Sequence, residues 1–185
     1  MKKDILLIGF IVLIVALLVS GTKIQSVEEY YLTHIDDVTP DSETVSLSIF
    51  CGSVFKNWDR LDPALKNGDY IPSDGNVLEK TEYVLRPGDT AFDLLDRAVR
   101  HHKIQMEYQG LDANIYKAVY IKGIHYLYEF SCGPHSGWMF MVNGEYPLYG
   151  CDQYLLKDGD YVEWIYTCDL GNDIGPKPWA ESGGM

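Results

Sequence analysis

The motif "CGPH" at residues 132–135 has the residue types of a thiol redox motif or of half a zinc site. A redox cysteine of this kind lies at a helix N-terminus, where the helix dipole lowers the thiol pKa. The residues that follow, 136–142, instead predict a strand that leads into Asn143-Gly144, a strong hairpin turn signal. The sequence therefore predicts no helix that would activate Cys132.

The four cysteines are better explained as structural disulfides. A zinc site at Cys132 and His135 would need two more ligands, and Cys151 and Cys168 are free for that role only if they form no disulfide. Cys51 and Cys168 each end a strand-like run, so these residues are neighbours if the two strands lie side by side and parallel. We expect disulfides between Cys51 and Cys168 and between Cys132 and Cys151 in an oxidising compartment.

Small and aromatic residues around the hairpin form a candidate binding surface. Aromatic rings with polar tips suit a planar, partly polar ligand or a protein face, and a glycine lets a ligand approach the backbone. Packing within the sheet is the alternative for each ring, because half of the residues in a strand point inward. The candidate ligand-binding residues are His135, Ser136, Gly137, Trp138, Tyr146 and Tyr149.

The sequence predicts no catalysis. It contains no paired carboxylates at a recognisable spacing, no phosphate-binding loop and no nucleophile elbow. Ser136 and His135 are adjacent in the chain, and neighbours at that spacing do not form the hydrogen bond of a catalytic triad. We also expect no cofactor.

An uncharged run at residues 5–21 follows two lysines at the start of the chain. Its 17 residues fall between the core of a signal peptide, about 7 to 15 residues, and a spanning helix of about 20. We interpret residues 1–21 as a signal-anchor, with a cleaved signal peptide as the alternative. The leading lysines favour a cytoplasmic N-terminus and an extracellular remainder. The protein is thus expected to be single-pass in the cell membrane, or secreted if it is cleaved.

The remainder of the chain is acidic. Removing three Lys and one Asp with residues 1–23 leaves 12 basic and 26 acidic residues, a net charge of −14. This charge makes nucleic acid and anionic lipid surfaces poor partners, and it favours solubility outside the cell.

The order of the predicted elements indicates the fold class. Residues 22–44 are an acidic linker, 45–170 form the folded domain and 171–185 a flexible tail. Within the domain, two strands precede a helix that starts with a capping box at Thr90 and Asp93, and several strands follow. This order predicts an α+β domain: a β-grasp-like mixed sheet with one packed helix.

Three segments resemble the transcobalamin-like C-terminal domain family of bacterial exported proteins: "YVLRPGDTAFDLLDRA", "SGWMFMVNGEYPLYGC" and "YLLKDGDYVEWIYTCDLG". The similarity extends over about residues 45–172. It implies a β-grasp-like fold related to the smaller domain of vitamin B12 carriers such as intrinsic factor. In those carriers this domain covers one face of cobalamin, and a large helical domain holds the other.

Two functions follow from these observations. In the first, the protein is a membrane-anchored, extracellular binding module that caps a cobalamin-like or other planar small molecule, with His135 as an axial ligand to the metal that the molecule carries. In the second, the same surface and the sheet edge contact a protein of the cell envelope, with no small-molecule ligand. The resemblance favours the first, and the absence of an expected helical partner domain in these 185 residues keeps the second open.

Overall fold

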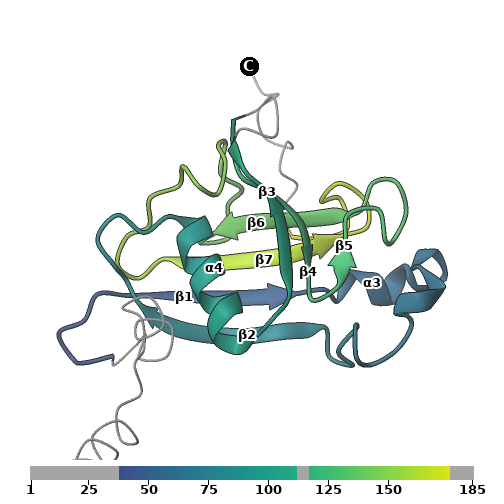
Figure 1. The fold of residues 1–185 in the computed structure, drawn as a ribbon, viewed down its shortest axis with the longest axis horizontal. Helices are drawn as coiled ribbons and strands as arrows, with labels where there is room; N and C mark the ends of the chain where they lie inside the picture. The colour runs from purple at the N-terminus through teal and green to yellow at the C-terminus, as the bar shows by residue number, and fades with distance from the viewer. Residues whose placement is uncertain (1–37, 112–116, 176–185) are drawn as a thin grey trace, which may run out of the picture. The chain divides into compact units, whose positions relative to one another are not determined.

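The computed structural model describes residues 38–111 and 117–175 (Figure 1). The predicted membrane segment at residues 5–21, the linker up to residue 37 and the tail from residue 176 lie outside this part of the chain. Among the residues that the structure describes, no helix is both long and apolar enough to cross a membrane.

The main sheet has four strands in the order β2-β1-β7-β6. Its strands are β2 (Asn76–Val84), β1 (Thr44–Phe50), β7 (Tyr161–Thr167) and β6 (Gly137–Val142). β1 and β7 pair in parallel, with Ser46 opposite Tyr161, and the other pairs are antiparallel. The α+β class and the mixed pairing expected from the sequence are therefore confirmed.

A second sheet of three strands, in the order β3-β4-β5, differs from the single sheet that the sequence predicted. Its strands are β3 (Met106–Gln109), β4 (Tyr120–Ile124) and β5 (Leu127–Tyr128). The reason lies between β4 and β5, where His125 and Tyr126 have φ angles of 52° and 64°. This left-handed turn folds Leu127 back opposite Ile124, so the segment pairs with itself and does not extend the main sheet.

Helix α4 (Ala91–His102) begins where the sequence predicted it. The Thr90 hydroxyl accepts a hydrogen bond from Asp93 N at 3.2 Å, and the Asp93 carboxylate accepts one from Thr90 N at 2.9 Å. This reciprocal pair satisfies two N–H groups that a helix leaves unpaired. The residues that α4 buries are Ala91, Leu94, Leu95, Arg97, Ala98 and Val99. Figure 1 shows α4 and the second sheet across one face of the main sheet, where the core lies.

The segment between β1 and β2 is irregular, with short turns at α3 (Ser53–Lys56), η1 (Trp58–Arg60) and η2 (Pro63–Leu65). Trp58 in this segment is 36% exposed. Leu61 and Ile71 of the same segment are buried.

A buried ion pair joins the end of β2 to α4. Arg97 Nη1 lies 2.8 Å from Asp89 Oδ2, and the two side chains are 6% and 10% exposed. Arg97 Nη2 also donates to Val84 O at 3.0 Å, while Arg86 N donates to Asp89 Oδ2 at 2.9 Å. Because both charges are out of water, either one would be costly to leave without its partner.

We therefore expect Asp89→Ala to lower the free energy of unfolding by about 3 to 5 kcal/mol, since it leaves the buried Arg97 charge unpaired. Asp96→Ala is the matched control. It removes the exposed pair between Asp96 and Arg100, which is 2.9 Å long, and such pairs contribute about 0.5 kcal/mol or less. Urea denaturation of both variants measures the difference, and equal losses would contradict this account of the pair.

Candidate binding pocket

A pocket of about 570 Å³ opens at the start of β6 and contains four of the six predicted binding residues, His135, Ser136, Gly137 and Trp138. The remaining lining residues come from β4, from the loop before β6, and from β6 and the end of β7: Tyr120, Phe130, Pro134, Met139, Thr167 and Leu170. The volume falls within the range of small-molecule sites, about 300 to 1,000 Å³.

Tyr146 and Tyr149, the other two predicted binding residues, do not line this pocket. Beyond the turn at Asn143-Gly144, the returning chain pairs with β6 through a single bridge between Val142 and Glu145, so these residues do not form an extended hairpin, and β6 pairs with β7 instead. The Tyr146 hydroxyl donates to Ile174 O at 3.1 Å, and Tyr149 stacks on Tyr154 with ring centroids 5.8 Å apart. The aromatic residues of the predicted binding surface therefore do not lie together: Trp138 lines the pocket, and Tyr146 and Tyr149 lie outside it.

Two loops form the pocket walls, and the backbone joins them. One is the loop at residues 129–136 before β6, and the other is residues 167–170 at the end of β7. Gly137 lies opposite Thr167 in the pairing of β6 with β7, which brings the loops to the same end of the sheet. Leu170 N donates to His135 O at 3.0 Å and so links one wall directly to the other.

Each wall carries a large apolar side chain in an unfavourable backbone conformation. Phe130 has a φ of 66° and is 63% exposed, and Leu170 has a φ of 49° and is 55% exposed. A left-handed conformation costs a non-glycine residue on the order of 1 to 2 kcal/mol, and an exposed side chain recovers little of it by packing. Such strain gathers at ligand-binding sites. The sequence analysis did not identify either residue.

The Tyr166 hydroxyl holds the first wall from below. Tyr166 is fully buried, and its proton is shared between Tyr128 O at 2.7 Å and Ser136 Oγ at 2.9 Å. Ser136 Oγ in turn donates to Gly133 O at 2.8 Å and accepts from Cys132 N at 3.0 Å. The hydroxyl pair thus fixes both ends of the tight loop that carries the wall. Burial, more than any other cause, raises the pKa of Tyr166 well above its usual range, so it stays a donor.

Trp138 is a structural residue as well as a pocket residue. It is 7% exposed, its Nε1 donates to Leu127 O at 2.8 Å, and its ring meets the Tyr166 ring edge-on at 5.3 Å. Only an edge of the indole can therefore touch a ligand, and most of its surface packs in the core.

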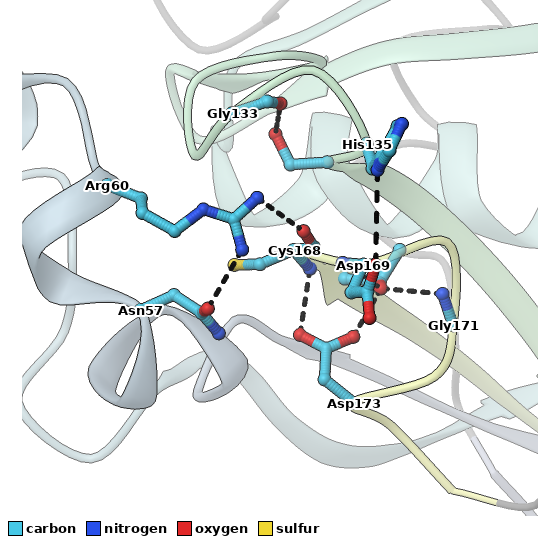
Figure 2. A network of polar contacts seen from close by, with 10 residues as sticks. Asn57, Arg60, Gly133, His135, Cys168, Asp169, Gly171 and Asp173 are labelled. Atoms are coloured by element: carbon cyan, nitrogen blue, oxygen red, sulfur yellow. Dashed lines mark hydrogen bonds and ion pairs between the residues drawn. The ribbon is translucent and has the colours of Figure 1, made fainter.

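A polar network fixes the second wall (Figure 2). The Asp173 carboxylate accepts from Cys168 N at 2.9 Å and from the Thr167 hydroxyl, and Thr167 Oγ1 accepts from Gly171 N at 2.7 Å. Arg60 Nη2 donates to Cys168 O at 3.3 Å from the other side. Asp173 lies in the segment that the sequence predicted to be a flexible tail, yet its contacts hold the loop on which Leu170 sits.

His135 stands at the pocket rim with a side chain that is 57% exposed. Its Nδ1 faces Asp169 Oδ1 at 4.0 Å. Within residues 38–111 and 117–175, no group of three or more His, Cys, Asp or Glu side chains is arranged to hold a metal ion.

The four cysteines are buried free thiols, so neither predicted disulfide is formed in this structure. Cys151 Sγ lies 3.7 Å from Val119 O, whereas Cys132 Sγ lies 3.5 Å from Asn57 O. Burial, together with a neighbouring aspartate, raises the pKa of both Cys51 and Cys151 to about 12. Thiols with such pKa values hold very little thiolate at neutral pH, which makes them unsuited to redox catalysis.

Comparison with known proteins gives a similarity to one family model, described as a domain of unknown function (DUF4430), over residues 88–167. That range runs from just before α4 to the last residue of β7 and excludes β1 and β2. No curated protein matches the chain.

Two solved structures resemble the fold. One, described as a "putative metal binding protein" from Ruminococcus gnavus, is 11% identical with a TM-score of 0.42, and the match covers 68% of this chain and 96% of that one. The other, haptocorrin in complex with Cbi, is 12% identical with a TM-score of 0.45, and the match covers 72% of this chain and 27% of that one. The chain thus spans about a quarter of the length of haptocorrin.

The strain at the pocket rim predicts the effect of Phe130→Gly. Glycine adopts a positive φ without steric cost, and this exposed ring contributes little packing, so the free energy of unfolding should stay constant or rise by up to about 1 kcal/mol. Phe55→Gly is the matched control, because Phe55 is 43% exposed but lies in helix α3. In a helix, the change to glycine should lower the free energy of unfolding by about 0.5 to 1 kcal/mol. Chemical denaturation measures the free energy of unfolding of both variants. A similar decrease in Phe130→Gly and Phe55→Gly would show that Phe130 is not strained.

Proposed function

We propose that this protein is an exported, membrane-anchored and non-catalytic binding module whose pocket covers one face of a planar, largely apolar small molecule, of which a corrinoid is the favoured class. The observation that carries this proposal is the pair of exposed, left-handed residues, Phe130 and Leu170, on opposing walls of the pocket.

The chemistry of the pocket suits a flat ligand with a polar rim. Phe130, Leu170 and Met139 offer apolar surface, while Tyr120 and His135 add polar groups at the edge. The Tyr120 hydroxyl donates to Glu129 Oε2 at 2.6 Å, so its ring is held in place before any ligand arrives. Because the exposed side chains stand at an open rim, the pocket would cover one side of a ligand and leave the other to solvent or to a second protein.

The corrinoid class comes from the resemblance to the transcobalamin-like family, together with the β-grasp-like fold that the resemblance implies. His135 fits a role as axial ligand to a corrin cobalt. Its Nδ1 lies 4.0 Å from Asp169 Oδ1, beyond hydrogen-bond distance, and Nε2 is the ring atom that would coordinate a metal.

The hydrogen bonding and burial of Ser136 agree with a binding role without catalysis. Ser136, the hydroxyl nearest His135 in sequence, already interacts with Gly133 O, Cys132 N and the Tyr166 hydroxyl and is 4% exposed. It is therefore occupied as a structural group and is not placed as a nucleophile.

Protein contact at the cell envelope is the second candidate function. One observation favours it: β6 lies at the edge of the main sheet, directly beside the pocket, so an added strand from a partner could pair there. In that case Phe130 and Leu170 would anchor side chains of the partner, and no small molecule would bind.

The ligand class is tested by titrating the full chain, solubilised in detergent, with cobalamin and with cobinamide while following Trp fluorescence and heat. We expect saturable binding that Phe130→Ala or Leu170→Ala weakens about tenfold or more. Leu148→Ala is the matched control, since Leu148 is 96% exposed and lies outside the pocket, and its affinity should equal that of wild type. No binding up to millimolar concentration by folded protein would reject the small-molecule proposal and leave protein contact.

The role of His135 is tested by the absorption spectrum of bound aquo-cobinamide. Coordination by imidazole replaces water on cobalt and shifts that spectrum, so wild type should show the shift and His135→Gln should not, even when the pocket is saturated. An identical spectrum in both would remove His135 as an axial ligand while leaving the pocket proposal intact.

A further inference from the structure

Cys132 and Cys168 are both fully buried in the core. Burial, and after it the Cys132 side chain, raises the pKa of Cys168. Both sulfurs rest on the same turn: Cys168 Sγ is 3.8 Å from Ser53 Oγ, the first residue of α3, and Cys132 Sγ is 3.5 Å from Asn57 O, at its end.

The pairing of the main sheet also places these cysteines together. Gly137 lies opposite Thr167 in the antiparallel pair of β6 and β7, so the residue before Gly137 and the residue after Thr167 face each other. Those residues are Ser136 and Cys168, and Ser136 Oγ accepts from Cys132 N at 3.0 Å.

We propose that Cys132 and Cys168 form a disulfide that joins the two walls of the pocket. Cys132 lies two residues after Phe130, and Cys168 lies two residues before Leu170. The bond would therefore tie together the two strained segments, which the non-covalent contacts of Ser136 and Asp173 hold separately. This pairing replaces both of the pairs that the sequence predicted.

The positions of the other two cysteines agree with this choice. Cys51 closes β1 beside Gly75, whose carbonyl accepts from Cys51 N at 2.8 Å. Cys151 lies beside helix α4, where its carbonyl accepts from Phe92 N in the first turn at 3.0 Å. Neither sulfur has a cysteine among its contacts in the described part of the chain.

The oxidation requires an external disulfide, either oxidised glutathione or an oxidised thiol oxidoreductase. One cysteine thiolate attacks a sulfur of that disulfide, forms a mixed disulfide and releases one external thiolate, which takes up the proton. The second cysteine thiolate then attacks the mixed disulfide, forms the bond between Cys132 and Cys168 and releases the second external thiol. Two electrons and two protons pass from the cysteine pair to the external disulfide, which becomes two thiols.

The bond forms during folding, before the loops close. In the folded domain burial, and after it the Cys132 side chain, raises the pKa of Cys168, so its thiolate is scarce and the pair is shielded from oxidants. The same burial protects the finished disulfide from reductants in the native state.

Peptide mapping tests the connectivity. The full chain is refolded with oxidised and reduced glutathione, alkylated, and digested without reduction by trypsin and a glutamyl endopeptidase. Cleavage after Glu145 and Lys157 puts Cys132, Cys151 and Cys168 on separate peptides. We expect one crosslinked species that joins the Cys132 peptide to the Cys168 peptide, with Cys51 and Cys151 alkylated. Either of the pairs predicted from the sequence, or four alkylated thiols, would overturn the proposal.

Thermal unfolding with and without reductant tests the same bond through stability. From the length of the loop that a disulfide between Cys132 and Cys168 would close, we expect reduction to lower the Tm of wild type by about 10 °C. Cys132→Ala and Cys168→Ala should lose this dependence on reductant, whatever their own Tm values are. Cys151→Ala, which removes an equally buried thiol, should keep it. Dependence that survives in Cys132→Ala would contradict the pairing. Both readouts are independent of ligand binding, so they do not depend on the proposed function.

Discussion

The hydroxyl of Tyr166 is the interaction on which the candidate site depends. It is fully buried at the end of β7, and it reaches the backbone of β5 at Tyr128 and the side chain of Ser136 before β6. Strand β7 and both ends of the loop before β6 therefore meet at one oxygen atom. Because the Tyr166 hydroxyl is buried, loss of both partners would leave it without a hydrogen bond, at a cost of about 1 to 3 kcal/mol, so the arrangement is strongly specified.

Rigid support of this kind explains how the pocket can present strained residues. Phe130 and Leu170 keep positive φ angles because their backbone N–H groups are bonded to Ser136 O and His135 O, each at 3.0 Å. The packing of the buried core stabilises the domain and so offsets the backbone strain at Phe130 and Leu170. Exposed apolar groups held in this way enter a complex without losing much conformational freedom, which favours affinity.

Much of the scaffold could be predicted from the sequence because it depends on local or periodic signals. The capping box at Thr90 and the alternation of Val45, Leu47 and Ile49 are local signals, and both correspond to the observed structure. Residues 135–138, which the sequence analysis proposed for ligand binding, line the pocket, and whether they bind a ligand stays a prediction.

The parts that the sequence did not predict depend on tertiary contacts. Phe130 and Leu170 carry no local signal for a positive φ, since neither is Gly, Asn or Asp. In the sequence Asp173 belongs to a segment that predicts a flexible tail, and its hydrogen bond with Thr167 appears only in the tertiary structure. The pairing of Cys51 with Cys168 was predicted from strand ends. The register sets Cys51 one position beyond Phe50, which lies opposite Ile165, and Ser53 lies beside Cys168. In each case the missing information was the register between segments distant in the chain.

The central claim is that both walls of the pocket are formed before any ligand binds. Hydrogen exchange at the Phe130 and Leu170 amides of the ligand-free protein tests it most directly. Both residues lie at the exposed rim, yet Phe130 N donates to Ser136 O within its own loop and Leu170 N donates to His135 O of the other loop. The account predicts that both exchange on the order of 100-fold or more slowly than in an unstructured peptide. Exchange of either amide at the rate of an unstructured peptide would contradict it.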